Sequence, residues 1–140
     1  LEALMETVAV RTEIELTLVS AEIPVVVPAA LEYRTTDPYA VSVVISAGEV
    51  EIRWLLARDL LDEGLVHEVG DGDVQIVPVM DGFEGQVVQI RLESPGGIAV
   101  LEVSTDAVLD FLAHSYALVA PGSESRHLDL DRELMELLAA

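Results

Sequence analysis

Strict alternation of apolar and polar residues dominates the first sixty residues. From Val8 to Leu18 one set of alternate positions is apolar apart from Thr12, while from Arg11 to Thr17 the other set is charged or Thr. This period of two predicts a strand with one buried face and one face in water. Further strands are predicted at residues 31–34, 39–46 and 50–56. Pro24 and Pro28 bracket three valines and separate them from the strand at 31–34.

Turn residues connect these predicted strands. Asp37-Pro38 predicts a turn, because Asp bonds the backbone ahead of it and Pro presets φ. Ala47-Gly48 predicts a tight hairpin link. Near Ala57 the apolar period changes from two to about 3.6, which predicts a short helix at 58–63. Gly64 is expected to end this helix in the usual C-terminal cap role.

The second half repeats this order. Strands are predicted at 74–80, 88–92 and 98–103, with turns at 70–73, 81–85 and 94–97, and Pro78 suggests an edge or a bulge. A helix follows from about Thr105, and Pro121-Gly122-Ser123 breaks it. A terminal helix is predicted from about Asp129, with an amphipathic row at Leu130, Leu134, Leu137 and Leu138. Two strands-then-helix halves predict an α+β fold of antiparallel, strand-rich sheets with a few helices, as a single domain over residues 1–140.

The composition is consistent with such a domain. Hydrophobic residues make up 51% of the chain, which suffices for a core and leaves apolar surface for a second copy. The chain has no cysteine, so disulfides, thiol nucleophiles and thiolate metal sites are excluded, as fits a cytoplasmic protein. We expect no membrane helix and no signal peptide, because neither a long apolar run nor a basic start is present. Residues before Glu6 are given no weight.

The charge is strongly one-sided. The chain has 26 acidic residues against seven arginines, and its net charge is -19. Such a surface repels both a phosphate backbone and an anionic membrane. The arginines are scattered along the sequence, so only a poor cationic patch is expected. The acidity either serves solubility or docks a basic patch of a partner.

The segment from His127 to Asp131 is the best candidate for a metal site. Imidazole and carboxylates suit zinc or manganese, and in an extended segment His127, Asp129 and Asp131 point the same way. The competing interpretation places Asp129 at the N-cap of the terminal helix and Asp131 in its first turn. Capping is favoured, and no metal site is expected.

The remaining polar motifs do not support catalysis. Asp71-Gly72-Asp73 resembles a fragment of a calcium loop, but the other ligands are missing, so a turn is expected. His67 is expected in a polar loop. His114 is expected in an amphipathic helix, at the surface or at the boundary between surface and core. No serine lies in a nucleophile elbow, and no glycine-rich phosphate loop precedes a helix. We therefore expect no enzyme and no cofactor.

Two aromatic residues and one charged pair can each be interpreted as structural or as functional. Trp54 and Tyr39 are expected in the core, with the Tyr39 hydroxyl bonded nearby. The alternative for Trp54 is stacking on a nucleic-acid base. Arg58 and Asp59, at the start of the short helix, are interpreted as structural.

Taken together, these blocks resemble the SsgA-like proteins, the sporulation and cell-division family of mycelial actinobacteria. The similarity runs from about Val8 to Leu138, and residues 127–134 most resemble the SsgB branch. The stretches at 22–27 and 79–86 do not resemble any member closely. The motif residues expected to be structural are Asp37, Pro38, Tyr39, Trp54, Arg58, Asp59 and Leu60.

The resemblance implies a non-enzymatic role in positioning the sporulation septum. An SsgB-type protein would recruit the tubulin-like division protein FtsZ to septa and promote its assembly, with an SsgA-like paralogue as a second partner. It also implies a whirly-like fold, related to single-stranded nucleic-acid-binding proteins, and a homotrimer. A single-stranded nucleic-acid binder is the alternative, which the acidic charge disfavours. FtsZ is usually acidic too, so we expect apolar surface to make the contact.

Overall fold

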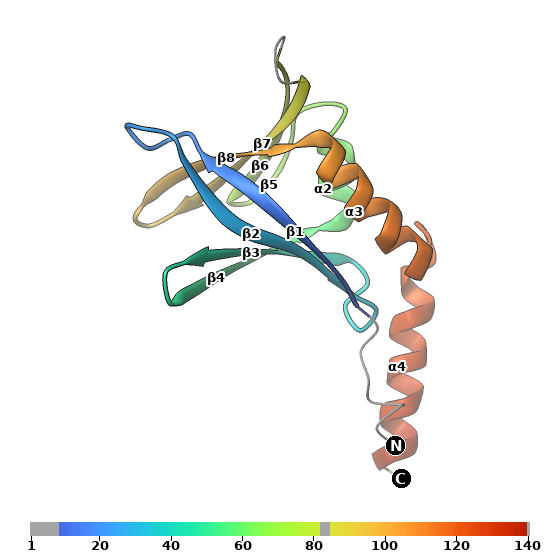
Figure 1. Ribbon diagram of the computed structural model, residues 1–140. Coiled ribbons are helices and arrows are strands. Elements are labelled where there is room, and N and C mark those ends of the chain that lie inside the picture. Colours follow the sequence, from blue (N-terminus) through green and yellow to red (C-terminus); the bar gives the residue numbers. More distant parts are fainter. Residues whose placement is uncertain (1–8, 82–84, 140) are drawn as a thin grey trace.

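The computed structural model describes residues 9–81 and 85–139, and in these ranges the eight strands form one antiparallel sheet in the order β4-β3-β2-β1-β8-β7-β6-β5 (Figure 1). Each strand pairs with its sequence neighbour through a turn, which is the arrangement that hairpin-linked strands favour. The strands are β1 Ala9–Leu18, β2 Val25–Arg34, β3 Ala40–Ala47, β4 Val50–Ala57, β5 Val69–Asp71, β6 Val74–Asp81, β7 Gly85–Ser94 and β8 Gly97–Ser104.

The sheet consists of two halves that meet only at a narrow junction. Within the described residues, β1 and β8 pair at Thr17↔Glu102 and Leu18↔Leu101, whereas β1 and β2 pair along their whole length. The two four-stranded halves diverge from this junction, so the sheet is strongly curled (Figure 1). We expected separate sheets, and the structure has one continuous curled sheet instead.

The predicted order of strands and helices is confirmed. Helix α2 (Arg58–Gly64) follows the first four strands, and α3 (Thr105–Leu118) and α4 (Glu124–Ala139) follow the second four. Helix α3 packs against the sheet and contacts β1, β7 and β8. Its side chains Val108, Phe111, Leu112 and Ser115 are buried. Helix α4 extends away from the sheet (Figure 1).

The second strand is longer than predicted. Strand β2 runs without interruption through Pro28, which lies opposite Glu15 of β1. Pairing of β2 with β3 starts only at Ala29. Pro28 therefore lies where the strand has a neighbour on one side only, a position that tolerates the missing N–H. Pro78 likewise lies beyond the end of β5, which confirms the predicted edge position.

Gly64 does not have the predicted cap role. It is the last residue of α2 and is absent from the glycines with positive φ, so its backbone is not left-handed. A Cβ at Gly64 would collide with Ile76 of β6, at 2.7 Å from its Cβ and closer still to its Cγ2. The position needs glycine because helix α2 packs directly on the sheet there, and not because the helix must turn.

The terminal helix begins earlier than predicted. Helix α4 starts at Glu124, so Asp129 lies inside the helix and is not its N-cap. The extended geometry required by the metal alternative is absent as well, because residues two apart in a helix lie on different faces. Among the described residues, no group of three or more His, Asp or Glu side chains is placed to hold a metal ion.

Candidate functional site

Arg58 lies in the interior with none of its surface exposed. Its Nη1 donates hydrogen bonds to the carbonyl oxygens of Val119 at 2.8 Å and Ser115 at 3.2 Å. Its guanidinium also lies over the rings of Tyr33 and Tyr116, each centroid 4.7 Å from Cζ. The buried cation is thus balanced by carbonyl dipoles and aromatic faces.

The motif residues form two stretches, a first motif at 37–39 and a second at 54–60, and the two meet at Arg58. The backbone N–H of Arg58 donates to the Tyr39 carbonyl oxygen at 2.8 Å, which extends the β3–β4 pairing by one step. The hydroxyl of Tyr33 donates to the Pro38 carbonyl oxygen at 2.8 Å. Tyr33 therefore connects the Asp37-Pro38 turn to the guanidinium. The first motif forms the turn, and the second supplies the buried charge beneath it.

Glu124 completes the buried centre. Its Oε2 accepts from Nη2 of Arg58 at 3.3 Å, and both side chains are almost fully buried. The backbone N–H of Glu124 and then the guanidinium of Arg58 hold the pKa of Glu124 below its usual value, against the effect of burial. Removing one partner of such a pair leaves an uncompensated buried charge. Through these contacts the centre holds α2, α3 and α4 in place. Because Arg58 has no exposed surface, the centre does not present a binding site.

The other motif residues have mixed outcomes. Tyr39 is 47% exposed, so the expectation of a buried side chain is wrong. Its backbone carbonyl makes the contact with Arg58, while the neighbouring Tyr33 occupies the core. Trp54 is partly buried against the core, close to the expectation. Asp59 is exposed in the first turn of α2, and Leu60 is partly buried.

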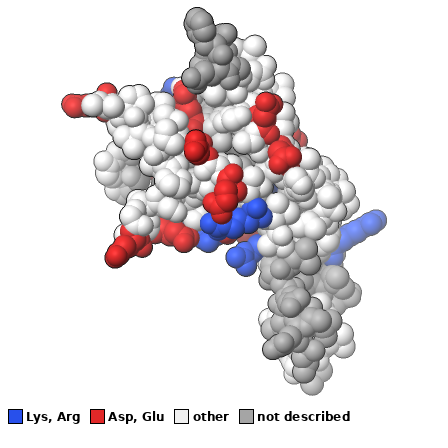
Figure 2. All heavy atoms as spheres, viewed as in Figure 1, with Lys and Arg blue, Asp and Glu red and all other residues white. Residues whose placement is uncertain are grey.

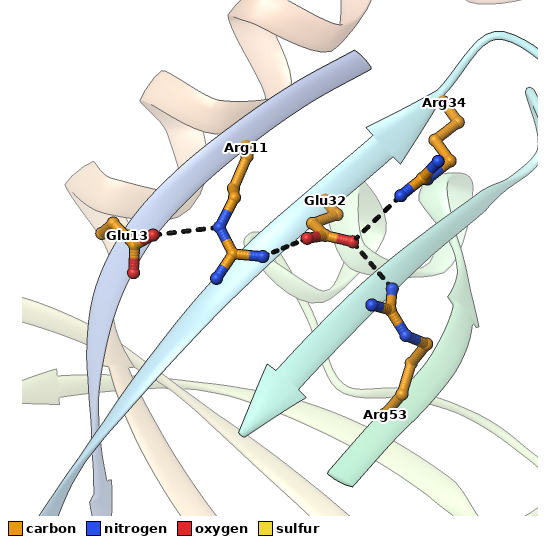
Figure 3. Close-up of polar contacts among 5 residues, drawn as sticks. All are labelled: Arg11, Glu13, Glu32, Arg34 and Arg53. Atoms are coloured by element: carbon orange, nitrogen blue, oxygen red, sulfur yellow. Dashed lines mark hydrogen bonds and ion pairs between the residues drawn. The ribbon is translucent and has the colours of Figure 1, made fainter. Parts of the chain in front are cut away.

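A second arginine centre lies on the outer face of the first four strands, opposite the core (Figure 3). Glu32 of β2 accepts hydrogen bonds from Arg11 of β1 and, at 2.7 Å, from Arg53 of β4. Nη2 of Arg34 is 3.9 Å from Glu32 Oε1, and Arg11 also bonds Glu13 at 3.0 Å. The guanidinium of Arg53 is the largest influence lowering the pKa of Glu32, with Arg11 acting in the same direction.

The strand register explains how these residues meet. One row across the four strands is Arg11, Glu32, Ser42 and Leu55, and the next is Glu13, Ala30, Val44 and Arg53. Ala30 and Val44 are fully buried although they face away from the main core.

Sequence analysis missed this cluster. It predicted scattered arginines, whereas three of the seven surround Glu32 on one face. Figure 2 shows basic side chains gathered in one area next to acidic ones, with mostly uncharged surface elsewhere in that view. The alternation correctly placed Arg11 and Glu13 on the exposed face of β1. It could not show that Glu32 lies opposite Arg11, since that depends on the register between strands.

Comparison with known proteins identifies the family. The profile of the family described as "Streptomyces sporulation and cell division protein, SsgA" matches residues 27–124. The chain belongs to this SsgA family of sporulation and cell-division proteins, which is not a known enzyme family.

Its relatives place it near one branch. It is 47% identical to the sporulation-specific cell division protein SsgB of Streptomyces coelicolor over 132 residues, covering 93% of this chain and 96% of the relative. It is 46% identical to SsgB of Kineococcus radiotolerans over 114 residues, covering 81% and 69%. The predicted similarity to SsgA-like proteins, and to SsgB in particular, is confirmed, and the chain has a role in cell division.

Solved structures agree with the fold. The chain matches a structure from a study correlating SsgB mutations with longitudinal division during sporulation of Streptomyces coelicolor, with a TM-score of 0.80, 44% identity and coverage of 86% and 96%. It matches the SsgA-like sporulation-specific cell division protein of Thermobifida fusca with a TM-score of 0.87, 36% identity and coverage of 93% and 96%. In the part of the chain that the structure describes, no helix has the length and apolarity to cross a membrane.

Proposed function

We propose that this protein positions the sporulation septum by recruiting the tubulin-like division protein FtsZ and promoting its assembly, without catalysis of its own. The similarity to SsgB over 93% of the chain carries this proposal. The resemblance that implies FtsZ recruitment covers the same residues, including both motifs that meet at Arg58. The protein would act in the cytoplasm at division septa, as one SsgA-like domain spanning residues 1–140.

The polar residues support a non-enzymatic role. Nδ1 of His67 lies 3.2 Å from the carbonyl oxygen of Glu68, and Nδ1 of His114 lies 2.8 Å from that of Asp110. Both histidines are exposed, and each bonds a backbone carbonyl rather than a nucleophile. The buried charged residue Arg58 has no exposed surface, so a substrate cannot reach it. The proposal therefore includes no cofactor and no substrate.

The protein would act as an assembly. We propose a homotrimer, with an SsgA-like paralogue as a further partner. Apolar side chains at the open ends of β2 and β4 support self-association, because Val25, Val50 and Ile52 are 47%, 62% and 44% exposed. The two four-stranded halves, the first followed by α2 and the second by α3 and α4, support kinship with the whirly fold. Sedimentation velocity tests the trimer, and a monomer at micromolar concentration would contradict it.

A pull-down from a sporulating lysate, probed with an antibody against FtsZ, tests the function. The proposal expects FtsZ to be retained by the purified chain. A labelled single-stranded oligonucleotide is titrated in parallel at low and high salt. Absence of FtsZ together with salt-sensitive oligonucleotide binding would favour the nucleic-acid-binding alternative.

A further inference from the structure

The outer arginine cluster has more guanidinium groups than carboxylates to pair with them. Arg11 and Arg53 already donate hydrogen bonds to both oxygens of Glu32. Arg34 adds a third guanidinium, whose nearest approach to Glu32, at 3.9 Å, is beyond hydrogen-bond distance. Arg11 also bonds Glu13, so two carboxylates face three guanidiniums. One positive charge and several N–H donors are left over.

These guanidiniums are accessible. The side chains of Arg11, Arg34 and Arg53 are 48%, 52% and 44% exposed. They lie close together on the outer face of β1, β2 and β4, away from the curled core (Figure 3). A guanidinium group can bind a carboxylate through two parallel hydrogen bonds. Such a pair fixes the orientation of the carboxylate as well as attracting it.

An exposed apolar side chain lies beside the cluster. Leu55 is 60% exposed and is two residues beyond Arg53 on β4, so it points to the same face. It is also in the same cross-strand row as Glu32, with Ser42 between them. The surface thus combines a cationic group with an apolar contact.

We propose that this surface, the arginine patch of Arg11, Arg34, Arg53 and Leu55, docks an acidic peptide segment of a partner protein. Partner carboxylates bind the guanidiniums, and a partner apolar side chain packs on Leu55. The inference rests on the proposed function as a recruiter and deepens it by naming the contact surface and the chemistry of the partner. It replaces our expectation that apolar surface alone makes the contact.

The surrounding charge favours a peptide over a nucleic acid. Glu13, Glu15 and Glu51 share the outer face with the patch and are exposed. A continuous phosphate backbone would pass over these carboxylates, whereas a short acidic segment contacts only the arginines. The chain has a net charge of -19, so most of its surface repels an acidic partner. The patch repels such a partner least, because three arginines lie there.

Fluorescence anisotropy with a labelled glutamate-rich peptide that contains leucine tests the proposal on the full chain. The comparison peptide has glutamine in place of glutamate. The patch variant is Arg34→Gln with Arg53→Gln, and the matched control is Arg91→Gln with Arg126→Gln, which removes the same charge from two other exposed arginines. Arg34→Glu is a second patch variant, chosen because the Arg34 side chain makes no hydrogen bond to any described residue and approaches Glu32 only to 3.9 Å.

We expect the acidic peptide to bind, the glutamine peptide to bind far more weakly, and affinity to fall with salt. The patch variants should bind roughly tenfold more weakly, as expected for two partly exposed ion pairs, and the control should match the original chain. Leu55→Ala should weaken binding while leaving its salt dependence unchanged.

Equal affinity of the patch and control variants would overturn the proposal, as would failure of the acidic peptide to bind the original chain. Binding of a single-stranded oligonucleotide as tight as that of the peptide would also overturn it, in favour of a phosphate site. The peptide assay contains no FtsZ. Peptide binding without FtsZ retention contradicts only the proposed function, and FtsZ retention without patch dependence contradicts only this inference.

Discussion

Arg58 and Glu124 form an ion pair of 3.3 Å inside the protein, although 66 residues separate them in the sequence. The pair joins the first residue of α2 to the first residue of α4. The same guanidinium binds carbonyl oxygens at the C-terminal end of α3 and lies over two tyrosine rings. One side chain therefore fixes three helices against the sheet.

Arg58→Met should destabilise the fold strongly. The substitution leaves the Glu124 carboxylate buried without its cation, which typically costs about 3–5 kcal/mol. Urea denaturation followed by circular dichroism measures the free energy of unfolding. Arg91→Met, at an exposed position, is the control and should change it by less than about 0.5 kcal/mol.

Replacing both partners should be less harmful than replacing one. Arg58→Met combined with Glu124→Leu removes the unpaired charge, so the double variant should be more stable than Arg58→Met alone. If the two single losses simply add in the double variant, the pair is not coupled and the proposed role of Arg58 is wrong.

Acid should weaken the fold through Glu124. Its folded pKa lies below the usual 4.5, so its contribution is fully present above that pH and is lost as the pH falls through the folded value. The pKa of Glu32 is also lowered, mainly by the guanidinium of Arg53. In urea titrations at a series of pH values, Glu124→Gln should be less stable at neutral pH and lose less stability on acidification. An unchanged acid slope in this variant would contradict the assignment.

Alkali should weaken the fold through Tyr116. Burial, and then the neighbouring Asp62 carboxylate, raise the pKa of Tyr116 to about 12. Folding thus favours the neutral phenol, so this contribution is complete below pH 10 and is lost between 10 and about 12. Burial also raises the pKa of Tyr33, so ultraviolet titration should show two late-titrating phenols, of which one is absent in Tyr116→Phe. Titration of all tyrosines near pH 10 would contradict the geometry.

Gly64→Ala should destabilise the packing of α2 on the sheet. The added methyl group collides with Ile76, and such overpacking typically costs about 1–3 kcal/mol. Gly96→Ala is a matched control, because a Cβ there meets only the Ser94 hydroxyl at 3.8 Å. Thermal unfolding of both variants makes the comparison. Similar melting temperatures for the two would show that α2 does not approach β6 so closely.

Strands and turns that depend on residues adjacent in the sequence were predictable from the sequence. Alternation located β1, β3 and β4. The hairpin predicted at Ala47-Gly48 is present, but its two-residue loop is Gly48-Glu49, with Gly48 at a φ of 65°. The short strand β5 was read as part of a turn, because three residues are too few to show a period.

Features that depend on register or tertiary packing were not predictable. Nothing near Arg58 in the sequence indicates that Glu124 will neutralise it. The start of α4 was misplaced for the same reason, since the residue that begins the helix is fixed by a distant arginine. The pairing of Arg11 with Glu32 likewise exists only once β1 and β2 are aligned.

Co-sedimentation with purified FtsZ in the presence of GTP tests the central claim most directly. The account predicts that the chain pellets with FtsZ polymers and increases the amount of polymer, and that it remains in the supernatant without FtsZ. Arg91→Gln should behave in the same way. If the chain stays in the supernatant and polymer mass is unchanged, direct recruitment of FtsZ by this protein is contradicted.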